Sequence, residues 1–591
     1  MPADSPVDWT DDGLPRSRAF GDVYFSAEDG LAESRAVFLQ GCGLPEAWAG
    51  RRRFVVGELG FGSGLNIAAL LQLWREARPA GGQLHIFSVE AHPLSADDAA
   101  RALARWPELA PVAERLVASW PGRARGRHRV ELPEVSAILD LAVMDVRAAL
   151  DGWEGRADAW FLDGFAPAAN PQMWTDEVLG LVAVRSQPGA RAATFTVAGQ
   201  VRRGLTAAGF EVAKRPGFGR KRERLEARLS GGPAEAAAPP RVAVVGAGIA
   251  GAAAARALRA LGVAHTVLEA DRPGAGGSGN PAALVMPRLD AGLGDAAQLF
   301  AQAFARAVQL YKALPDAVIS RGVLQLAAAP RDADRFARIA ASDIFEPGAL
   351  SPLDGAGASA RLGEAVGDAL DQAAALVVEP ARVLAAWLGE VSTARVAGLE
   401  RRDGRWRLLD AAGSEIAAAD VVVLAAALGS RELNPQAPLQ PVRGQASIAE
   451  GEPPVPAAAW GGYVVPTRGG VLFGATHDRD DDRADLRAGD HPRNVATLAK
   501  ALPGLAGRLA ERPLSGRASV RAVTPDRLPL AGALGDGLFA LTGFGSRGFS
   551  LAPLLAEHVA ALAAGAPSPI GRAAAELVDP GRFARRAARR S

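Results

Sequence analysis

The chain has 591 residues, too many for a single hydrophobic core, so we expect two or more domains. Its 49% apolar and 22% charged residues are typical of a globular protein, and a net charge of +1 predicts no overall attraction to nucleic acid or membrane. One cysteine, Cys42, excludes an internal disulfide or a cysteine-based metal cluster and suits the cytoplasm. We expect neither a signal peptide nor a membrane span, because no sufficiently apolar segment occurs.

The segment FVVGELGFGSGLNIAALLQLW predicts a strand from Phe54, a glycine turn, and a helix from Leu65 to about Trp74. Glycines let the backbone turn sharply and approach a ligand closely. The N-terminus of the following helix presents unpaired N–H groups and the positive end of the helix dipole. The pattern therefore predicts a ligand-binding turn in an α/β domain.

Two further acids end apolar strands, Glu90 in LHIFSVE and Asp145 in LAVMDV. In open α/β sheets an acid after the second strand often binds ribose hydroxyls. The E-x-G-x-G-x-G spacing is neither the dinucleotide pattern nor a triphosphate loop. It resembles that of class I S-adenosylmethionine-dependent methyltransferases. This resemblance implies cofactor contacts at Glu58, Gly60, Gly62, Gly64, Asn66, Glu90 and Asp145, and the alternative is an ordinary turn with surface acids.

Asp163 follows another apolar strand in WFLDGFAPAANPQMW, residues 160–174. In the methyltransferases that the chain resembles, this place handles the methyl acceptor, and members that methylate amines often have Asp or Asn there. An alkyl amine has a pKa near ~10.4 and must lose a proton before it attacks a methyl group. Asp163 is therefore predicted to accept that proton and to aim the nitrogen. The alternatives are a helix cap or a buried ion pair.

SGGPAEAAAPP, residues 230–240, predicts a linker between a domain at 1–229 and another at 241–591. The second domain begins with RVAVVGAGIAGAAAARALRALGVAHTVLEAD, which contains the full dinucleotide fingerprint of Gly246, Gly248 and Gly251. The acid Glu269 ends the second strand, 23 residues after the first glycine (269 − 246). This spacing predicts a bound dinucleotide.

Three features favour FAD over NAD. GAGGSGNPAALVMPRL follows the second strand, and its Ser278, Gly279 and Asn280 permit close approach to a cofactor. Residues 402–430 predict a hairpin that returns to a parallel strand, as in flavoprotein oxidoreductases. Residues 537–562 resemble the strand, loop and helix that reach the flavin in amine oxidases of the glycine-oxidase and D-amino-acid-oxidase type. This resemblance implies cofactor contacts at Gly543, Gly545, Ser546, Arg547 and Gly548.

Arg521, in GRASVRAVTPDRLPLAG, resembles the substrate-carboxylate arginine of those oxidases. A guanidinium suits a carboxylate because it donates two parallel hydrogen bonds. The alternative is a structural arginine. Arg547 is a second candidate for this role, and His477 and Asp478 are expected near the flavin.

Together the two halves resemble the bacterial family of bifunctional tRNA 5-methylaminomethyl-2-thiouridine biosynthesis proteins. The resemblance spans nearly the whole chain and includes DGLPRSRAFGDVYFS, GLAESRAVFLQG, WFLDGFAP, PGFGRKRE and TGFGSRGFSLAP. It implies a Rossmann-like methyltransferase domain followed by a glycine-oxidase-like FAD domain with an α+β substrate subdomain. The implied reaction on the anticodon wobble uridine of tRNA is FAD-dependent removal of a carboxymethyl group, followed by methylation of the freed amine. Ala169 replaces a lysine usual in the family, which weakens one expected RNA contact.

Arginine-rich stretches begin at Gly122, Arg215 and Arg582, and we expect either solvated faces or contacts to tRNA phosphates. Two other functions stay open: the same two reactions on a small-molecule amine, or a scaffold that binds cofactors without catalysis. No metal and no obligatory protein partner is expected.

Overall fold

The computed structural model describes residues 5–219, 221–232 and 238–589. The chain divides into two compact units, Met1–Ala238 and Pro239–Ser591, and this division falls within the segment expected to be a linker. Residues 233–237 of that segment, and Arg220 and Arg590 of the arginine-rich stretches, lie outside the described residues. Within the described ranges no helix has the length and apolar character needed to span a membrane.

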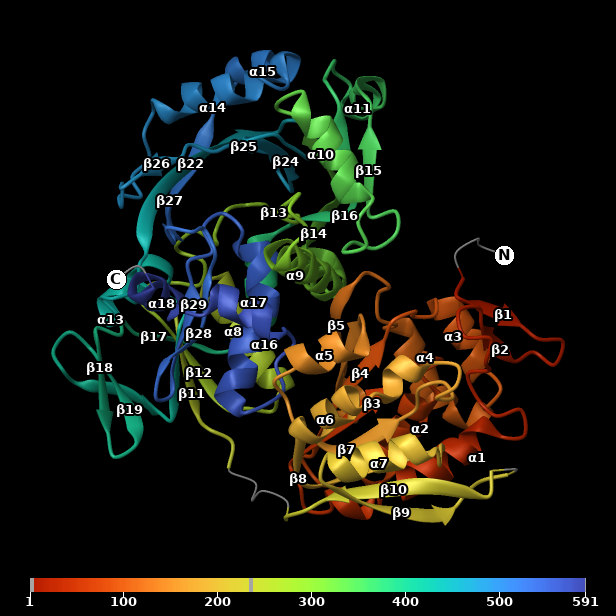
Figure 1. Ribbon diagram of the computed structural model, residues 1–591. Helices are drawn as coiled ribbons and strands as arrows, with labels where there is room; N and C mark the ends of the chain where they lie inside the picture. The colour runs from red at the N-terminus through yellow and green to blue at the C-terminus, as the bar shows by residue number, and fades with distance from the viewer. Residues whose placement is uncertain (1–4, 220, 233–237, 590–591) are drawn as a thin grey trace. The chain divides into compact units, whose positions relative to one another are not determined.

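A mixed eight-stranded sheet forms the centre of unit 1 (Figure 1). Its strands, in spatial order, are β5 (Gly126–Leu132), β6 (Ala137–Val143), β4 (Gln83–Glu90), β3 (Arg53–Leu59), β7 (Ala157–Leu162), β8 (Ser186–Thr194), β10 (Glu223–Leu229) and β9 (Phe210–Pro216). Strands β6, β4, β3, β7 and β8 run parallel, so their carboxyl ends share one edge. Strands β1 (Val7–Trp9) and β2 (Pro15–Ser17) form a separate ribbon.

Helices cover both faces of this sheet because successive strand side chains point to opposite sides. Val56 belongs to the core under α2, α3 and α4, whereas its neighbour Val55 belongs to the core under α5, α6 and α7. The helices are α1 (Gly30–Ser34), α2 (Leu65–Ala77), α3 (Ala96–Leu103), α4 (Ala110–Ala118), α5 (Val146–Gly152), α6 (Asp176–Val184) and α7 (Gly199–Ala207). Unit 1 is therefore a doubly wound α/β domain.

Unit 2 contains a six-stranded sheet and a larger ten-stranded sheet. The six-stranded sheet has the order β17 (Val391–Thr393), β12 (His265–Glu269), β11 (Val242–Val245), β21 (Val421–Leu424), β29 (Leu538–Thr542) and β28 (Leu530–Gly535). The larger sheet consists of β13 (Ala283–Val285), β16 (Ala369–Val378), β14 (Val318–Leu326), β23 (Ala458–Ala459), β24 (Tyr463–Thr467), β25 (Gly470–Gly474), β22 (Gln440–Glu450) and β26 (Asp478–Arg479), with β15 (Leu350–Leu353) and β27 (Ser515–Val523) at its sides. The expected hairpin is the sheet β18 (Gly398–Arg402), β19 (Arg405–Leu409) and β20 (Glu415–Ala419), and β21 follows it parallel to β11.

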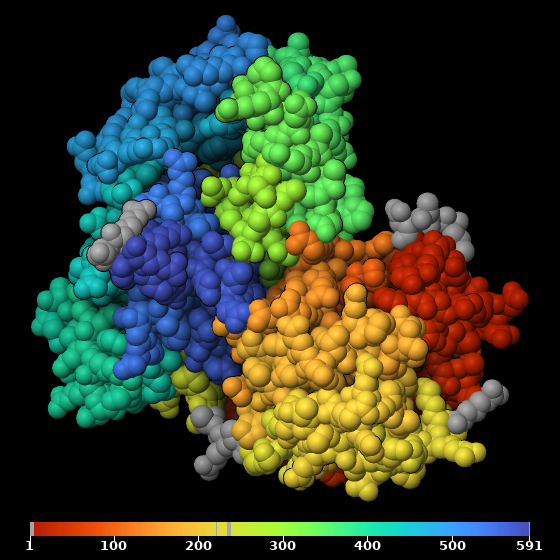
Figure 2. Space-filling model, viewed as in Figure 1, coloured from red at the N-terminus to blue at the C-terminus, as the bar shows by residue number. Residues whose placement is uncertain are grey.

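Helix α16 (Gly548–Ala564) is buried on nearly all sides, beside α8 (Ile249–Ala260) and α9 (Asp295–Lys312). The alanines of α8 leave room for this close approach. The other helices are α10 (Arg331–Ala340), α11 (Gly355–Leu362), α12 (Pro380–Leu388), α13 (Ser430–Leu433), α14 (Asp490–Ala499), α15 (Pro503–Ala510), α17 (Arg572–Val578) and α18 (Arg582–Ala588). Figure 2 shows a hollow in the surface of unit 2 below α14.

Candidate active sites

A cavity of 430 Å³ lies at the carboxyl edge of the unit 1 sheet. Backbone bonds hold the loops that follow β3, β4 and β7 together there: Asp163 N donates to Leu59 O at 3.0 Å, and Gly60 N donates to Val89 O at 3.0 Å. Gly60 has a φ of +99°, and a Cβ at this position would lie 2.4 Å from the carbonyl oxygen of Asp163. Only glycine therefore permits the turn beside the acid.

Asp163 lines this cavity and accepts a hydrogen bond from Asn66 Nδ2 at 2.6 Å. Asn66 in turn accepts from Ser34 Oγ at 2.7 Å. Burial raises the pKa of Asp163 to about 7, although the bond from Asn66 opposes this rise. These contacts favour a proton acceptor over a helix cap or an ion-paired structural acid.

The glycine turn and Glu90 also face the cavity. Gly60, Gly62, Asn66 and Glu90 are among its lining residues. One carboxylate oxygen of Glu90 accepts from Gly62 N at 3.0 Å and the other from His92 N at 2.8 Å. Gly64 instead caps α2 in a left-handed conformation, with a φ of +76°, and does not line the cavity. Its role is to start the helix whose N-terminus follows the turn.

Like Gly64, the expected cofactor residues Glu58 and Asp145 do not line the cavity. Glu58 is fully buried behind the turn and accepts from Ser88 Oγ at 2.6 Å, and burial raises its pKa to about 8. Asp145 caps α5 by accepting from Ala148 N at 3.1 Å. Its neighbours Met144 and Val146 line the cavity in its place.

Aromatic and charged residues from elsewhere in the chain complete the wall. The Phe165 ring lies 5.0 Å from that of Phe20 and 5.3 Å from that of Tyr24, and all three residues line the cavity. Glu33 and Lys221 also line it and form an ion pair at 2.8 Å. None of these five residues has a chemical role that the sequence predicts, although all lie in or beside the quoted motifs.

Unit 2 contains two connected cavities of 280 Å³ and 450 Å³ that share lining residues such as Gly248 and Ser278. Gly246 and Glu269 line the narrower cavity, and Asn280 lines the wider one. At the N-terminus of α8, Ile249 N donates to Ser278 Oγ at 3.0 Å. A helix N-terminus between two cavities suits a diphosphate that joins two ring systems.

Two glycines that the sequence predicts as cofactor contacts, Gly251 and Gly279, serve packing instead. Gly251 and Gly279 line neither cavity. A Cβ at Gly251 would lie 1.8 Å from the carbonyl oxygen of Gly246, and a Cβ at Gly279 would lie 2.2 Å from that of Gly274. Close packing of the backbone, between helix and strand at Gly251 and within the following loop at Gly279, therefore requires them, rather than contact with a ligand.

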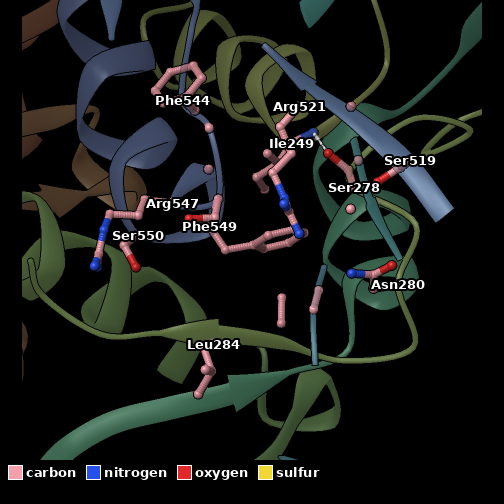
Figure 3. A pocket seen from close by; sticks show the side chains of 18 of the residues that line it. Ile249, Ser278, Asn280, Leu284, Ser519, Arg521, Phe544, Arg547, Phe549 and Ser550 are labelled. Atoms are coloured by element: carbon pink, nitrogen blue, oxygen red, sulfur yellow. Dashed lines mark hydrogen bonds between the residues drawn. The ribbon is translucent and has the colours of Figure 1, made fainter. Parts of the chain in front are cut away.

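The loop at 543–548 and the strand β27 form one end of the wider cavity. Gly545 N donates to Ala522 O at 2.9 Å and joins the two segments. In Figure 3 the guanidinium groups of Arg521 and Arg547 lie on different sides of the pocket. The lining residues of the loop include the five expected ones, Gly543, Gly545, Ser546, Arg547 and Gly548.

Arg521 is a cation without an ion pair among the described residues, and its side chain donates one long hydrogen bond of 3.4 Å to Thr476 O. Gly444 makes room for it, because a Cβ there would lie 2.3 Å from its guanidinium. Burial lowers the pKa of Arg521, but an arginine stays charged near neutral pH. Burial and this charge also lower the pKa of His477, which lines the cavity. Asp478 does not line it and pairs with Arg493 at 2.7 Å.

Comparison with known proteins relates both units to described families. Residues 107–230 match a family model of S-adenosyl-L-methionine-dependent methyltransferases, and residues 241–562 match one of FAD dependent oxidoreductases. The tRNA 5-methylaminomethyl-2-thiouridine biosynthesis bifunctional protein MnmC of Caulobacter vibrioides is 62% identical over 98% of each chain. The protein of the same name from Maricaulis maris is 45% identical over 99% of this chain and 97% of its own.

The chain belongs to the MnmC family of bifunctional proteins. It is an enzyme with a methyltransferase domain and an FAD-dependent oxidoreductase domain, and it uses S-adenosylmethionine and FAD. An Amadoriase I mutant from Aspergillus fumigatus has the fold of unit 2, with a TM-score of 0.50, 17% identity, and coverage of 61% of this chain and 93% of that one. A glycine oxidase from Geobacillus kaustophilus, at 23% identity, matches 56% of this chain and 96% of its own with a TM-score of 0.48.

Two of the arginine-rich stretches of this MnmC-family chain contain buried arginines. Arg129 is buried and binds Asp140 through two hydrogen bonds of 2.8 and 2.7 Å. Arg582 is buried and binds Asp526, also through two bonds, of 2.9 Å each. These two side chains stabilise the fold. Neither expected interpretation of the stretches, a solvated face or a contact to RNA, describes this role.

Proposed function

We propose that the chain modifies the wobble uridine of cytoplasmic tRNA in two steps. The FAD unit removes the carboxymethyl group from 5-carboxymethylaminomethyl-(2-thio)uridine and leaves a primary amine. The methyltransferase unit then methylates this amine to give 5-methylaminomethyl-(2-thio)uridine. The related MnmC proteins support the proposal, because they are named for the biosynthesis of this nucleoside.

The first substrate side chain is an N-substituted glycine, and Arg521 is proposed to bind its carboxylate. A fork of two parallel hydrogen bonds would hold the glycine carbon in one orientation in the wider cavity. FAD, when bound, supplies the acceptor for the hydride that leaves this carbon. Water then adds to the resulting C=N bond, and cleavage of the C–N bond releases glyoxylate and the primary amine.

The second step needs an amine nitrogen with a free lone pair. Asp163 is proposed to take the proton from the ammonium, and Asn66 keeps its carboxylate in place through the bond of 2.6 Å. A pKa of about 7 suits an acid that must be ionised before it can accept a proton at neutral pH. S-adenosylmethionine supplies the methyl group. We also propose that Glu90 and the turn at Gly60–Gly62 hold the cofactor, since they line the same cavity.

Arg521 is the observation on which the substrate assignment rests. A buried cation that faces a cavity, with no carboxylate partner in the part of the chain that the structure describes, favours an anionic substrate. The rival small-molecule amine would also satisfy this residue. Arg521 alone therefore does not distinguish tRNA from a small-molecule amine. Mass spectrometry of tRNA nucleosides makes this distinction.

The decisive experiment is mass spectrometry of tRNA nucleosides from a deletion strain complemented with variants. We expect Arg521→Ala to accumulate the carboxymethyl form and Asp163→Ala to accumulate the primary amine. Full modification with both variants would refute the residue assignments. Unchanged tRNA nucleosides in the deletion strain itself would refute tRNA as the substrate.

A further inference from the structure

The methyltransferase cavity contains a primary ammonium group that belongs to the chain itself. Lys221 Nζ lies 2.8 Å from Glu33 Oε1 and 4.0 Å from the centre of the Phe195 ring. All three residues line the cavity. A carboxylate together with the face of an aromatic ring is a suitable receptor for a cation.

This ammonium lies in the same cavity as Asp163. Glu33 is in α1, and the next residue, Ser34, donates to Asn66 at 2.7 Å. Asn66 then donates to Asp163 at 2.6 Å. Consistent with this proximity, the charge of Glu33 contributes to the raised pKa of Asp163, second to burial among the effects that raise it.

The two partners of the ion pair differ in their access to solvent. The Lys221 side chain is 46% exposed and lies in the turn between β9 and β10, whereas the Glu33 side chain is only 13% exposed. Lys221 can therefore move into water at little cost. Glu33 would stay behind as a poorly solvated charge, so it requires another cation in place of Lys221.

We propose that Glu33 and Phe195 form a site for a primary ammonium, which Lys221 fills until the aminomethyl group of the methyl acceptor replaces it. This inference rests on the proposed function. No covalent bond changes in the exchange, and one ammonium group replaces another. Glu33 thereby places the acceptor nitrogen close to Asp163, which takes its proton.

The same site discriminates between the two substrates of the enzyme. The precursor still has a carboxylate on the group attached to its nitrogen. In this cavity that carboxylate would face the like charges of Glu33 and Asp163 and would be repelled. The methyltransferase cavity therefore selects the product of the oxidase step, and methylation follows oxidation.

The test is the affinity of the full-length protein for the free nucleoside 5-aminomethyluridine, which has no phosphate to contact Lys221. We expect Glu33→Gln to weaken binding about 10- to 100-fold, as for loss of a charged hydrogen bond. We expect Lys221→Met to strengthen binding several-fold, because the competing ammonium is gone. The affinity for unmodified uridine should not change in either variant.

Lys214→Met is the matched control, since Lys214 pairs with Glu223 at 2.7 Å on the same hairpin but does not line the cavity. Opposite effects of Glu33→Gln and Lys221→Met support the proposal. Weaker binding in both variants would instead identify a structural ion pair, and unchanged binding in Glu33→Gln would equally overturn the ammonium site. Thermal unfolding and S-adenosylmethionine binding report whether each variant is folded.

Methyl transfer to tRNA that bears the primary amine separates this proposal from the proposed function. If the ammonium site exists, we expect Glu33→Gln to raise the KM for this tRNA with little change in kcat. If wild-type protein transfers no methyl group to this tRNA, the proposed function fails, whereas the nucleoside affinities still decide the ammonium site.

Discussion

Asn66 donates a hydrogen bond of 2.6 Å to Asp163, although the two residues are 97 positions apart in the chain. Asn66 belongs to the first turn of α2, directly after the glycine turn, and Asp163 follows the neighbouring strand β7. The bond therefore ties the proposed proton acceptor to the turn proposed to hold the methyl donor. Parallel pairing of β3 and β7 brings the two residues to the same edge of the sheet.

Replacement of Asp163 should abolish most methyl transfer and spare oxidation. We expect Asp163→Asn to lower the single-turnover methylation rate about 10²- to 10⁴-fold, the usual contribution of a general base. Nucleoside mass spectrometry should then find the primary amine. The FAD reaction of the same sample is the internal control, and equal loss of both reactions would indicate misfolding instead.

The methylation rate should rise with pH through the pKa of Asp163, which burial raises to about 7. Only the ionised carboxylate accepts a proton, so the logarithm of the rate should increase at acidic pH and level off above the pKa. The positive charge of bound S-adenosylmethionine would move this inflection to lower pH. Rates measured from pH 5 to 9 test this, and an inflection that persists in Asp163→Asn would assign it to another group.

Arg521→Met should block the oxidase step without loss of FAD. We expect KM for the carboxymethyl substrate to rise about 100-fold or more, because a charged hydrogen-bonded pair is worth about 1.5–3 kcal/mol and two bonds are lost. The flavin absorbance of the purified variant should match that of wild type. The matched control is Arg402→Met, since the side chain of Arg402 is 67% exposed in the sheet β18–β20. A normal KM in Arg521→Met would remove this arginine from substrate binding.

Gly251→Ala should destabilise unit 2 although Gly251 lines neither cavity. The new Cβ would lie 1.8 Å from the carbonyl oxygen of Gly246, which forces α8 away from β11. We expect a loss of about 3 kcal/mol or more, at or beyond the upper end of ordinary overpacking, together with weaker FAD retention. In the control Gly507→Ala a Cβ meets nothing within 4 Å, and a helix interior favours alanine over glycine. Thermal unfolding compares the two, and equal stability of both variants would contradict the packing role.

Asp526→Asn should destabilise unit 2 in a pH-dependent manner. Burial opposes ionisation of Asp526, but hydrogen bonds from Arg582 and Arg586 lower its pKa well below the usual value. A depressed pKa stabilises the folded state above the unfolded-state pKa of about 3.9, and this stabilisation is lost as the pH falls further. The stability difference between wild type and variant should therefore be constant above about pH 5 and shrink below pH 4. Denaturant unfolding across this range measures it, and a difference that grows on acidification would contradict the pairing.

Local patterns in the sequence were sufficient to predict both strand–turn–helix units. The strands β11 and β12 end at Val245 and Glu269, as the fingerprint predicts, and α2 starts at Leu65. The backbone has a positive φ at Gly60 and Gly246, a conformation that favours glycine. This requirement is local, so the sequence alone predicts the turns. Family resemblance predicts Arg521 and Asp163 as site residues, and both line cavities of the expected units.

Sequence order could not reveal which acids face a cavity. Glu58 and Asp145 have the expected spacing, yet one is buried behind the turn and the other caps a helix. Charge runs were equally ambiguous, because Arg129 points inward to Asp140 on the adjacent strand. The side of a strand or helix that meets solvent depends on the elements packed against it.

The strand–turn–helix units and the two cofactor classes are thus local properties, set by residue types over some thirty positions, about the length of a βαβ unit. The pairing of Glu33 with Lys221, 188 positions apart, exists only because α1 and the β9–β10 hairpin meet at one cavity. Packing of distant segments brings such charges together, and the burial of Glu33 then favours a cation beside it.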